Sequence, residues 1–88
     1  MQENDPEVVF IIRSLTSGRF RLSQHAQNGM RQRGITMSDL HEVGRSCRFW
    51  KHQPSGRWLI EGFDANHQLL GVVCVYEGET VVITVIAY

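Results

Sequence analysis

The sequence predicts an α+β fold in which N-terminal helices pack on a four-stranded antiparallel sheet. Apolar residues first recur at helical spacing, over about residues 6–45, and then gather in strand-like runs over about residues 47–87. The connections between these segments are short, which favours a meander of neighbouring strands. We expect one domain, residues 1–88, near the lower size limit for a self-sufficient core.

A first helix is predicted at about residues 6–17. Residues 1–5 form a loose tail, and the last of them, Asp5, can cap the helix, while Pro6 suits its first position. Gly18 can adopt the left-handed conformation that commonly follows a helix. Apolar residues at three- and four-residue spacing mark the buried side of this helix.

A second helix is predicted at about residues 24–33, after a short extended piece at residues 19–22. Ser23 is a good N-cap for this helix, and Gly34 is a good stop. Gly29, in the middle, costs about 1 kcal/mol relative to alanine. Its presence therefore indicates either a close neighbour or an opening at that position.

A third helix begins after Thr36, which can form a capping box with Asp39, and Gly44 is expected to stop it. Its inward-facing residues are predicted to be Met37, Leu40 and Val43.

Four strands are predicted after this helix, at about residues 47–52, 57–63, 69–76 and 80–87. The last two are apolar at nearly every position. This pattern indicates that they are central in the sheet and covered on both faces.

The net charge is zero, but the charges are unevenly distributed. All nine basic residues lie between Arg13 and Arg57, and nine cations against only Asp39 and Glu42 leave that stretch at +7. Two interpretations stay open: a positive face that attracts phosphate backbones, or charges scattered over a solvated surface. Eight of the nine are arginines, which favour bidentate phosphate contacts.

The sequence argues against several kinds of site. Cys47 and Cys74 have no CxxC pair around them and the four histidines are dispersed, so no metal, cofactor or disulfide is predicted. Both cysteines are expected to be reduced, apolar side chains on strands. No apolar run has the length of a membrane span and no signal-type segment is found, so the expected location is cytoplasmic.

His25 is the first candidate for a catalytic residue. It lies in the first turn of the second predicted helix, where the dipole disfavours an imidazolium and favours a nearby anion. A neutral histidine among arginines can act as a general acid or base on a phosphodiester. The alternative is a structural histidine that hydrogen-bonds a strand carbonyl.

Arg33 is the second predicted catalytic residue, because it can hold a phosphate and stabilise developing charge. We expect it to be partly buried at the boundary of helix and sheet, where it can instead pair with Asp39 or Glu61. Arg31 points to the other side of the helix. It is either a solvated surface charge or a further RNA contact.

Lys51, Arg57 and Trp58 complete the predicted phosphate- and RNA-binding residues. With Trp50 they form a cationic and aromatic cluster across the turn at Pro54, and arginine with tryptophan can stack bases. The alternative is that the two tryptophans pack against each other as a cross-strand pair.

Residues 23–35, SQHAQNGMRQRGI, and the TMSDLHEV that follows them resemble the domain of unknown function 4258 family, over about residues 20–86. The family pattern is similar to S/T-x-H-A-x-x-R-M-x-x-R-G-I, and the matching positions are His25, Ala26, Met30, Arg33, Gly34 and Ile35. The chain departs from the family where Gly29 replaces an arginine. It also has Gly71 and Ile86 where many relatives carry histidine and tyrosine.

The resemblance implies a compact fold of the RelE-like and BrnT-like toxin type, in which several members cleave RNA and relatives are encoded beside a small antitoxin. Our first hypothesis is a toxin-like, RNA-directed protein of a toxin–antitoxin type system, acting as a metal-independent ribonuclease. The alternative is a non-catalytic interaction module, or degenerate toxin, that binds a protein partner. RNA, a cognate antitoxin and a second copy of the chain are the partners considered, and no membrane is among them.

Overall fold

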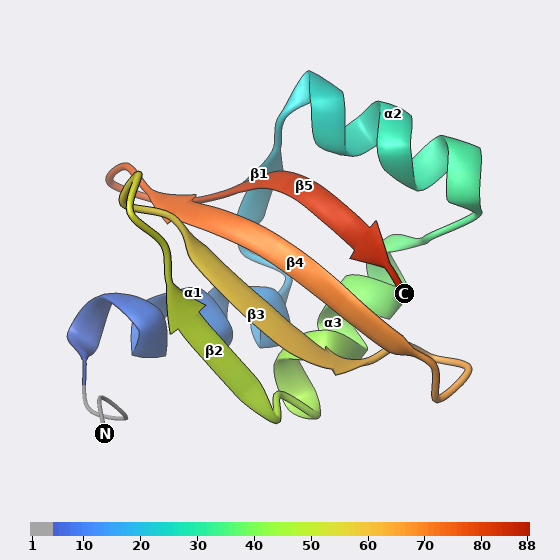
Figure 1. Cartoon of the computed structure of the whole chain (residues 1–88), viewed down its shortest axis with the longest axis horizontal. Helices are drawn as coiled ribbons and strands as arrows, with labels where there is room; N and C mark the ends of the chain where they lie inside the picture. Colours follow the sequence, from blue (N-terminus) through green and yellow to red (C-terminus); the bar gives the residue numbers. More distant parts are fainter. Residues whose placement is uncertain (1–4) are drawn as a thin grey trace.

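The computed structural model describes residues 5–88, in which three helices accompany one five-stranded sheet (Figure 1). Of the tail predicted at residues 1–5, residues 1–4 lie outside the described residues. The elements in chain order are α1 (Pro6–Ser17), β1 (Phe20–Leu22), α2 (Gln24–Arg33), α3 (Met37–Arg45), β2 (Phe49–His52), β3 (Trp58–Phe63), β4 (Leu69–Tyr76) and β5 (Thr80–Ala87).

The sheet has the strand order β1-β5-β4-β3-β2 and is mixed. β2 to β5 form the predicted antiparallel meander, but β1 adds a fifth strand that runs parallel to β5, with Phe20 opposite Thr80. The prediction of a four-stranded antiparallel sheet is therefore wrong at this edge. β1 has three residues, too few to show the alternation by which a strand is recognised in a sequence.

The caps predicted for α1 and α2 are confirmed. The Asp5 side chain accepts a hydrogen bond from Glu7 N at 2.9 Å, and Gly18 follows α1 with a φ of 78°. Ser23 Oγ accepts from Ala26 N at 3.0 Å, and Gly34 follows α2 with a φ of 66°. These positive φ values are the reason for glycine at both stops.

The third helix differs from its prediction at two places. The capping box of Thr36 and Asp39 is present, but α3 continues through Gly44 and ends at Arg45. A Cβ at Gly44 would lie 2.7 Å from the backbone nitrogen of Thr16, so this glycine allows α1 and α3 to touch. Met37, predicted to face inward, is 49% exposed.

The strands of the β2–β3 hairpin are shorter than predicted, because residues 47, 48 and 57 fall outside them. Cys47, expected on a strand, therefore precedes β2 and is half-buried, whereas Cys74 lies buried on β4 as expected. β4 and β5 have the predicted bounds and central places.

Helices α1 and α3 cover one face of the sheet, and in Figure 1 no helix lies in front of the other face. The core lies between these layers and includes Leu15, Leu40 and Val72. Val73 and Val81 are 5% and 4% exposed on the uncovered face and are not part of that core. The expected helical cover on both faces is therefore wrong, although these two valines of the uncovered face are themselves buried.

Two glycines inside helices should respond to alanine in opposite directions. Gly44→Ala should lower the free energy of unfolding by about 1–3 kcal/mol, the cost of overpacking, because its Cβ would collide with the α1 backbone. Gly29→Ala should raise it by about 0.5–1 kcal/mol, because the nearest atoms to its Cβ are 3.6 and 3.7 Å away, an ordinary contact distance. Urea unfolding of both variants measures the difference, and a loss of stability in Gly29→Ala would contradict this account.

Candidate functional site

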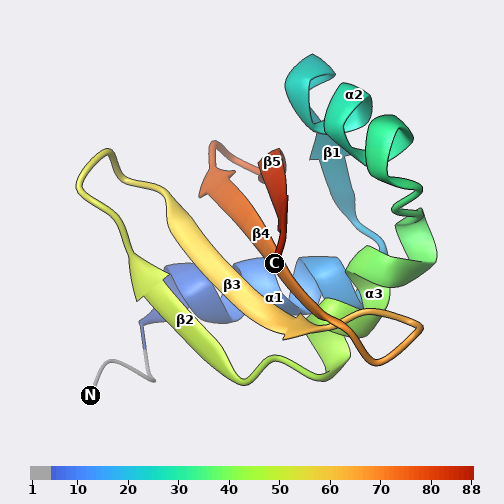
Figure 2. The same cartoon turned by 45° about the vertical axis from the view of Figure 1, so that its right-hand side comes forward.

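Helix α2 is fixed to the sheet by Ser23, the residue between it and β1. Ser23 N donates to Val82 O at 2.9 Å, and Ser23 Oγ donates to Ile83 O at 2.8 Å. Figure 2 shows α2 running on from the end of β1, beside β5. Ala26 and Met30 point from this helix into the core.

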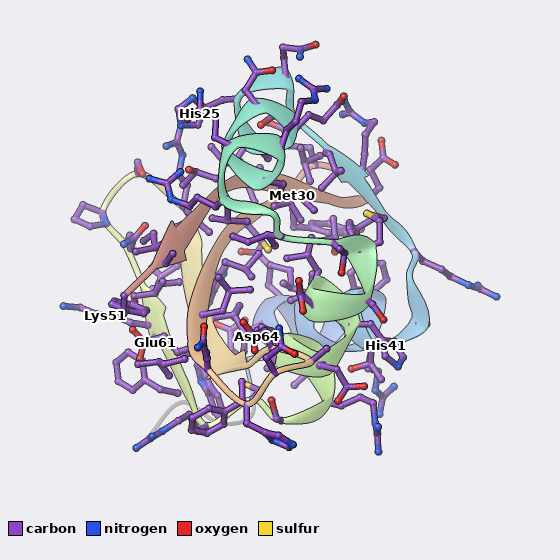
Figure 3. The ribbon with its side chains drawn as sticks, turned by 90° about the vertical axis from the view of Figure 1, so that its right-hand side faces the viewer. His25, Met30, His41, Lys51, Glu61 and Asp64 are labelled. Atoms are coloured by element: carbon purple, nitrogen blue, oxygen red, sulfur yellow. The ribbon has the colours of Figure 1, made fainter. Side chains whose placement is uncertain are left out.

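His25, Gly29 and Arg33 follow one another at four-residue intervals, so they lie along one side of α2. His25 is exposed, and Figure 3 shows it on the same side of the molecule as Lys51 and Glu61. Within residues 5–88 no strand carbonyl accepts a hydrogen bond from its ring. We call the three residues the α2 stripe.

Arg33 folds back along the α2 stripe. Its Nη1 atom lies 3.7 Å from the position that a Cβ at Gly29 would take. Arg33 is exposed, not partly buried as expected, and it makes no ion pair with any carboxylate among residues 5–88. The guanidinium is therefore free to contact a ligand.

The two carboxylates considered as partners of Arg33 are occupied elsewhere. Asp39 accepts from Thr36 N at 2.8 Å and from Ala65 N at 3.0 Å. Burial by itself would raise the pKa of Asp39, but these hydrogen bonds and one from the Thr36 hydroxyl lower it. Glu61 accepts a hydrogen bond from the Tyr88 hydroxyl.

Lys51 and Arg57 belong to the uncovered side of the β2–β3 hairpin. Lys51 follows Trp50, which packs against the core, so strand alternation turns it to the opposite face. Arg57 precedes the buried Trp58, and a hydrogen bond from Gln53 N to Arg57 O continues the ladder. Alternation therefore places both cations on the face that bears Glu61.

Arg31 and Trp58 lie away from this arrangement. Arg31 is exposed and its Nη1 lies 3.4 Å from Asn28 Oδ1 on the same helix. Trp58 is 3% exposed beneath α1, where its Nε1 donates to Glu7 Oε1 at 2.8 Å. It stands against His52, with ring centroids 4.6 Å apart, and Trp50 is paired with Ile60. The predicted pairing of the tryptophans is therefore wrong, and Trp58 has no surface for a base.

The pairing of Tyr88 with Glu61 is not among the contacts that the sequence predicts. Tyr88 lies over Gly71, since a Cβ there would be 2.9 Å from the tyrosine hydroxyl. Burial, followed by the hydrogen bond and the charge of Glu61, raises the pKa of Tyr88 to about 12. Alternation along β3 places Glu61 on the uncovered face, but no local pattern predicts that Tyr88 folds back to meet it.

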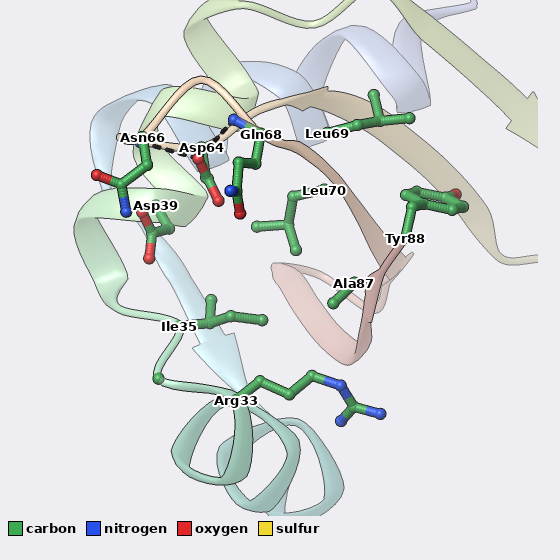
Figure 4. Close-up of a pocket in the computed structure, with 11 residues that line it drawn as sticks. Arg33, Ile35, Asp39, Asp64, Asn66, Gln68, Leu69, Leu70, Ala87 and Tyr88 are labelled. Carbon is green, nitrogen blue, oxygen red and sulfur yellow. Dashed lines mark hydrogen bonds between the residues drawn. The ribbon is translucent and has the colours of Figure 1, made fainter.

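A cavity of about 430 Å³ opens at the end of the sheet, beside the last turn of α2 (Figure 4). It lies between the α2–α3 turn, the β3–β4 loop and the end of β5. Arg33 and Ile35 line one side, and Asp64 and Gln68 line another. This cavity adjoins the α2 stripe through Arg33, which belongs to both.

Comparison with known proteins places most of the chain in one family. The family model described as Domain of unknown function (DUF4258) matches residues 22–87. The chain belongs to the DUF4258 family. No curated protein and no solved structure matches it.

The part of the chain that matches the DUF4258 model contains the whole α2 stripe and most of the cavity lining. Helix α1 lies outside the match. None of the helices within residues 5–88 is long and apolar enough to cross a membrane. In the same residues no three side chains of the histidine, cysteine, aspartate and glutamate types gather as a metal site, and the absence of a metal stays a prediction.

Asp39 should stabilise this DUF4258 domain in a pH-dependent way. Asp39→Ala should lower the free energy of unfolding by about 1–2 kcal/mol at pH 7, because it leaves the amides of Thr36 and Ala65 without their acceptor. The folded-state pKa lies below the ordinary value of 3.8, so this contribution is present above 3.8 and is lost as pH falls through the folded-state pKa. Urea unfolding at pH 7 and at about pH 2 should show the difference between variant and wild type shrinking in acid. A difference that stays constant would contradict a role of the carboxylate.

Proposed function

We propose that the chain binds RNA through the α2 stripe and through Lys51 and Arg57 on the uncovered sheet face. The observation that carries this proposal is the free guanidinium of Arg33, which lies over Gly29 on the side of α2 that bears the exposed His25. An exposed arginine without a carboxylate partner is suited to a phosphate, which it can hold through two hydrogen bonds.

The reaction that these side chains suit is metal-independent cleavage of RNA. An unprotonated imidazole nitrogen of His25 takes the proton of a ribose 2′-hydroxyl, and the 2′-oxygen bonds to phosphorus. The bond from phosphorus to the 5′-oxygen breaks, and the leaving oxygen takes a proton from water. Arg33 offsets the negative charge that builds on the phosphoryl oxygens.

The remaining cations provide the RNA path away from the reacting phosphate. Lys51 and Arg57 lie on the uncovered face of the β2–β3 hairpin, and Arg31 extends the positive charge at the end of α2. Such contacts hold the phosphate backbone of RNA without distinguishing its base sequence. With the family resemblance, this arrangement supports a toxin-like, RNA-directed protein of a toxin–antitoxin type system.

A second candidate function is supported by the apolar character of the uncovered face. Phe49 is 44% exposed there, and Leu59, Val75 and Ile86 are half-buried. An apolar floor rimmed by cations suits a protein partner with an apolar surface and acidic edges. This feature favours a non-catalytic interaction module, with an antitoxin-like protein or a second copy of the chain as partner.

Two substitutions in the α2 stripe should separate RNA binding from a structural role. Arg33→Ala should weaken RNA binding and reduce the slope of log K against log salt by about 0.7, the contribution of one phosphate contact in single strands. His25→Ala should reduce the cleavage rate by about 10²–10⁴-fold while binding persists. RNA titrations at several salt concentrations and cleavage assays measure both effects.

The matched control is Arg45→Ala, which removes an exposed arginine of α3 that is paired with Glu42 at 3.5 Å. It should leave the salt slope unchanged. Urea midpoints of both α2 variants should stay at the wild-type value. A wild type that binds no RNA, or an Arg33→Ala variant that loses stability without losing affinity, would end the RNA proposal.

Gly29→Arg should strengthen RNA binding, since it adds a cation to the α2 stripe. A Cβ at this position is accommodated, because its nearest atoms, Val85 Cγ2 and Arg33 Nη1, lie at 3.6 and 3.7 Å. The salt slope should increase by about 0.7. An unchanged slope in a variant of wild-type stability would mean that RNA does not pass over this side of α2.

A further inference from the structure

The cavity beside Arg33 has the size of a small-molecule site, and polar side chains make up much of its lining. Its volume of about 430 Å³ falls in the range of about 300–1,000 Å³ that is usual for such sites. Ile35, Leu69 and Ala87 supply apolar walls, and the ring of Tyr88 stands at the edge. Such walls suit a flat, aromatic ligand.

Asp64 gives the cavity a fixed acceptor. Its Oδ1 accepts hydrogen bonds from Asn66 N at 2.8 Å and from Gln68 N at 2.9 Å, which hold the β3–β4 loop closed. Figure 4 shows the other carboxylate oxygen pointing toward the cavity, and it makes no hydrogen bond within residues 5–88. The loop itself therefore holds this oxygen in place before a ligand arrives.

The side-chain amides of Asn66 and Gln68 supply the complementary donors. Both residues are exposed, and neither amide group is bound to another of the described residues. Each amide offers two N–H donors and one acceptor oxygen. The cavity thus combines the free oxygen of Asp64 with adjustable amide groups, because the other carboxylate of its lining, Asp39, already accepts from two backbone N–H groups.

This set of groups matches the Watson–Crick edge of guanine. Guanine presents two neighbouring N–H donors, at N1 and N2, which the two lone pairs of the free Asp64 oxygen can accept, and its O6 accepts from an amide. Adenine turns the lone pair of N1 toward the same carboxylate, and cytosine does so with N3. Uracil has a single N–H between two carbonyl oxygens, both of which the carboxylate would repel.

We propose that this cavity binds a guanine base of single-stranded RNA, with the adjoining phosphate on Arg33. The inference rests on the proposed RNA function and deepens it, because it names the base that the protein selects. Asp64 selects the base, Gln68 and Asn66 hold its O6, and Arg33 joins the base site to the α2 stripe.

The test compares short single-stranded oligonucleotides that differ only in one central base, guanine, adenine, cytosine or uracil, by fluorescence titration. The wild type should bind the guanine oligonucleotide about tenfold more tightly than the other three, the effect of one charge-assisted hydrogen bond. Asp64→Asn keeps an oxygen for the loop but turns an N–H₂ toward the base, so it should abolish this preference. Binding of the uracil oligonucleotide should not weaken.

Glu77→Gln, in the exposed β4–β5 turn, removes the same charge far from the cavity and should keep the preference. If Asp64→Asn shifts the urea midpoint, Gln68→Ala tests the same site, because its exposed side chain has no bound partner among residues 5–88. It should also reduce the guanine preference.

The possible results separate the guanine site from the proposed RNA binding. Equal affinity for all four oligonucleotides, with the Arg33 salt effect intact, overturns the guanine site and leaves RNA binding standing. Preference for another base overturns it as well. Binding of guanosine 5′-monophosphate that Asp64→Asn abolishes, in a protein that binds no oligonucleotide, supports the guanine site and overturns the RNA function.

Discussion

β5 pairs with β4 along one edge, and the hydrogen bonds along its other edge are the constraint on which the rest of the structure depends. β1 satisfies that edge for three residues, from Thr80 to Val82, and Ser23 then binds the backbone at Val82 and Ile83. The same serine caps α2 through Ala26 N. One residue therefore ends the parallel pairing, starts the helix and sets where the α2 stripe lies relative to the sheet.

The glycines Gly44 and Gly62 allow the helices to approach one face of the sheet closely. A Cβ at Gly62 would lie 2.6 Å from the carbonyl oxygen of Val43, and one at Gly44 would meet the backbone of Thr16. Backbone thus contacts backbone from α1 to α3 and from α3 to β3. Both helices are held on one side of the sheet, and Lys51 and Arg57 are exposed on the other side.

Local signals in the sequence were enough to predict most element ends, since a cap needs only a few neighbouring residues. The failures have longer-range causes. β1 is a strand because β5 offers it a partner, and Gly44 stays helical because α1 touches it. The cavity joins Arg33, Asp64 and Tyr88 from three separate segments, so no spacing along the chain could predict it. His25 and Arg33 share one predicted helix, so the sequence alone is enough to place them on the same element.

The position of Arg33 shows what changes at Gly29, where the family pattern has an arginine. A side chain at position 29 would begin its course between Val85 and the Arg33 guanidinium. With glycine there, Arg33 folds back and places its own charge beside that position, on the side of α2 that carries His25. The departure at Gly29 therefore lowers the number of cations on the α2 stripe but leaves one beside the position that the missing arginine would have occupied. That cation also lines the cavity. In the proposed RNA complex, Arg33 would therefore join the phosphate on the α2 stripe to the base in the cavity.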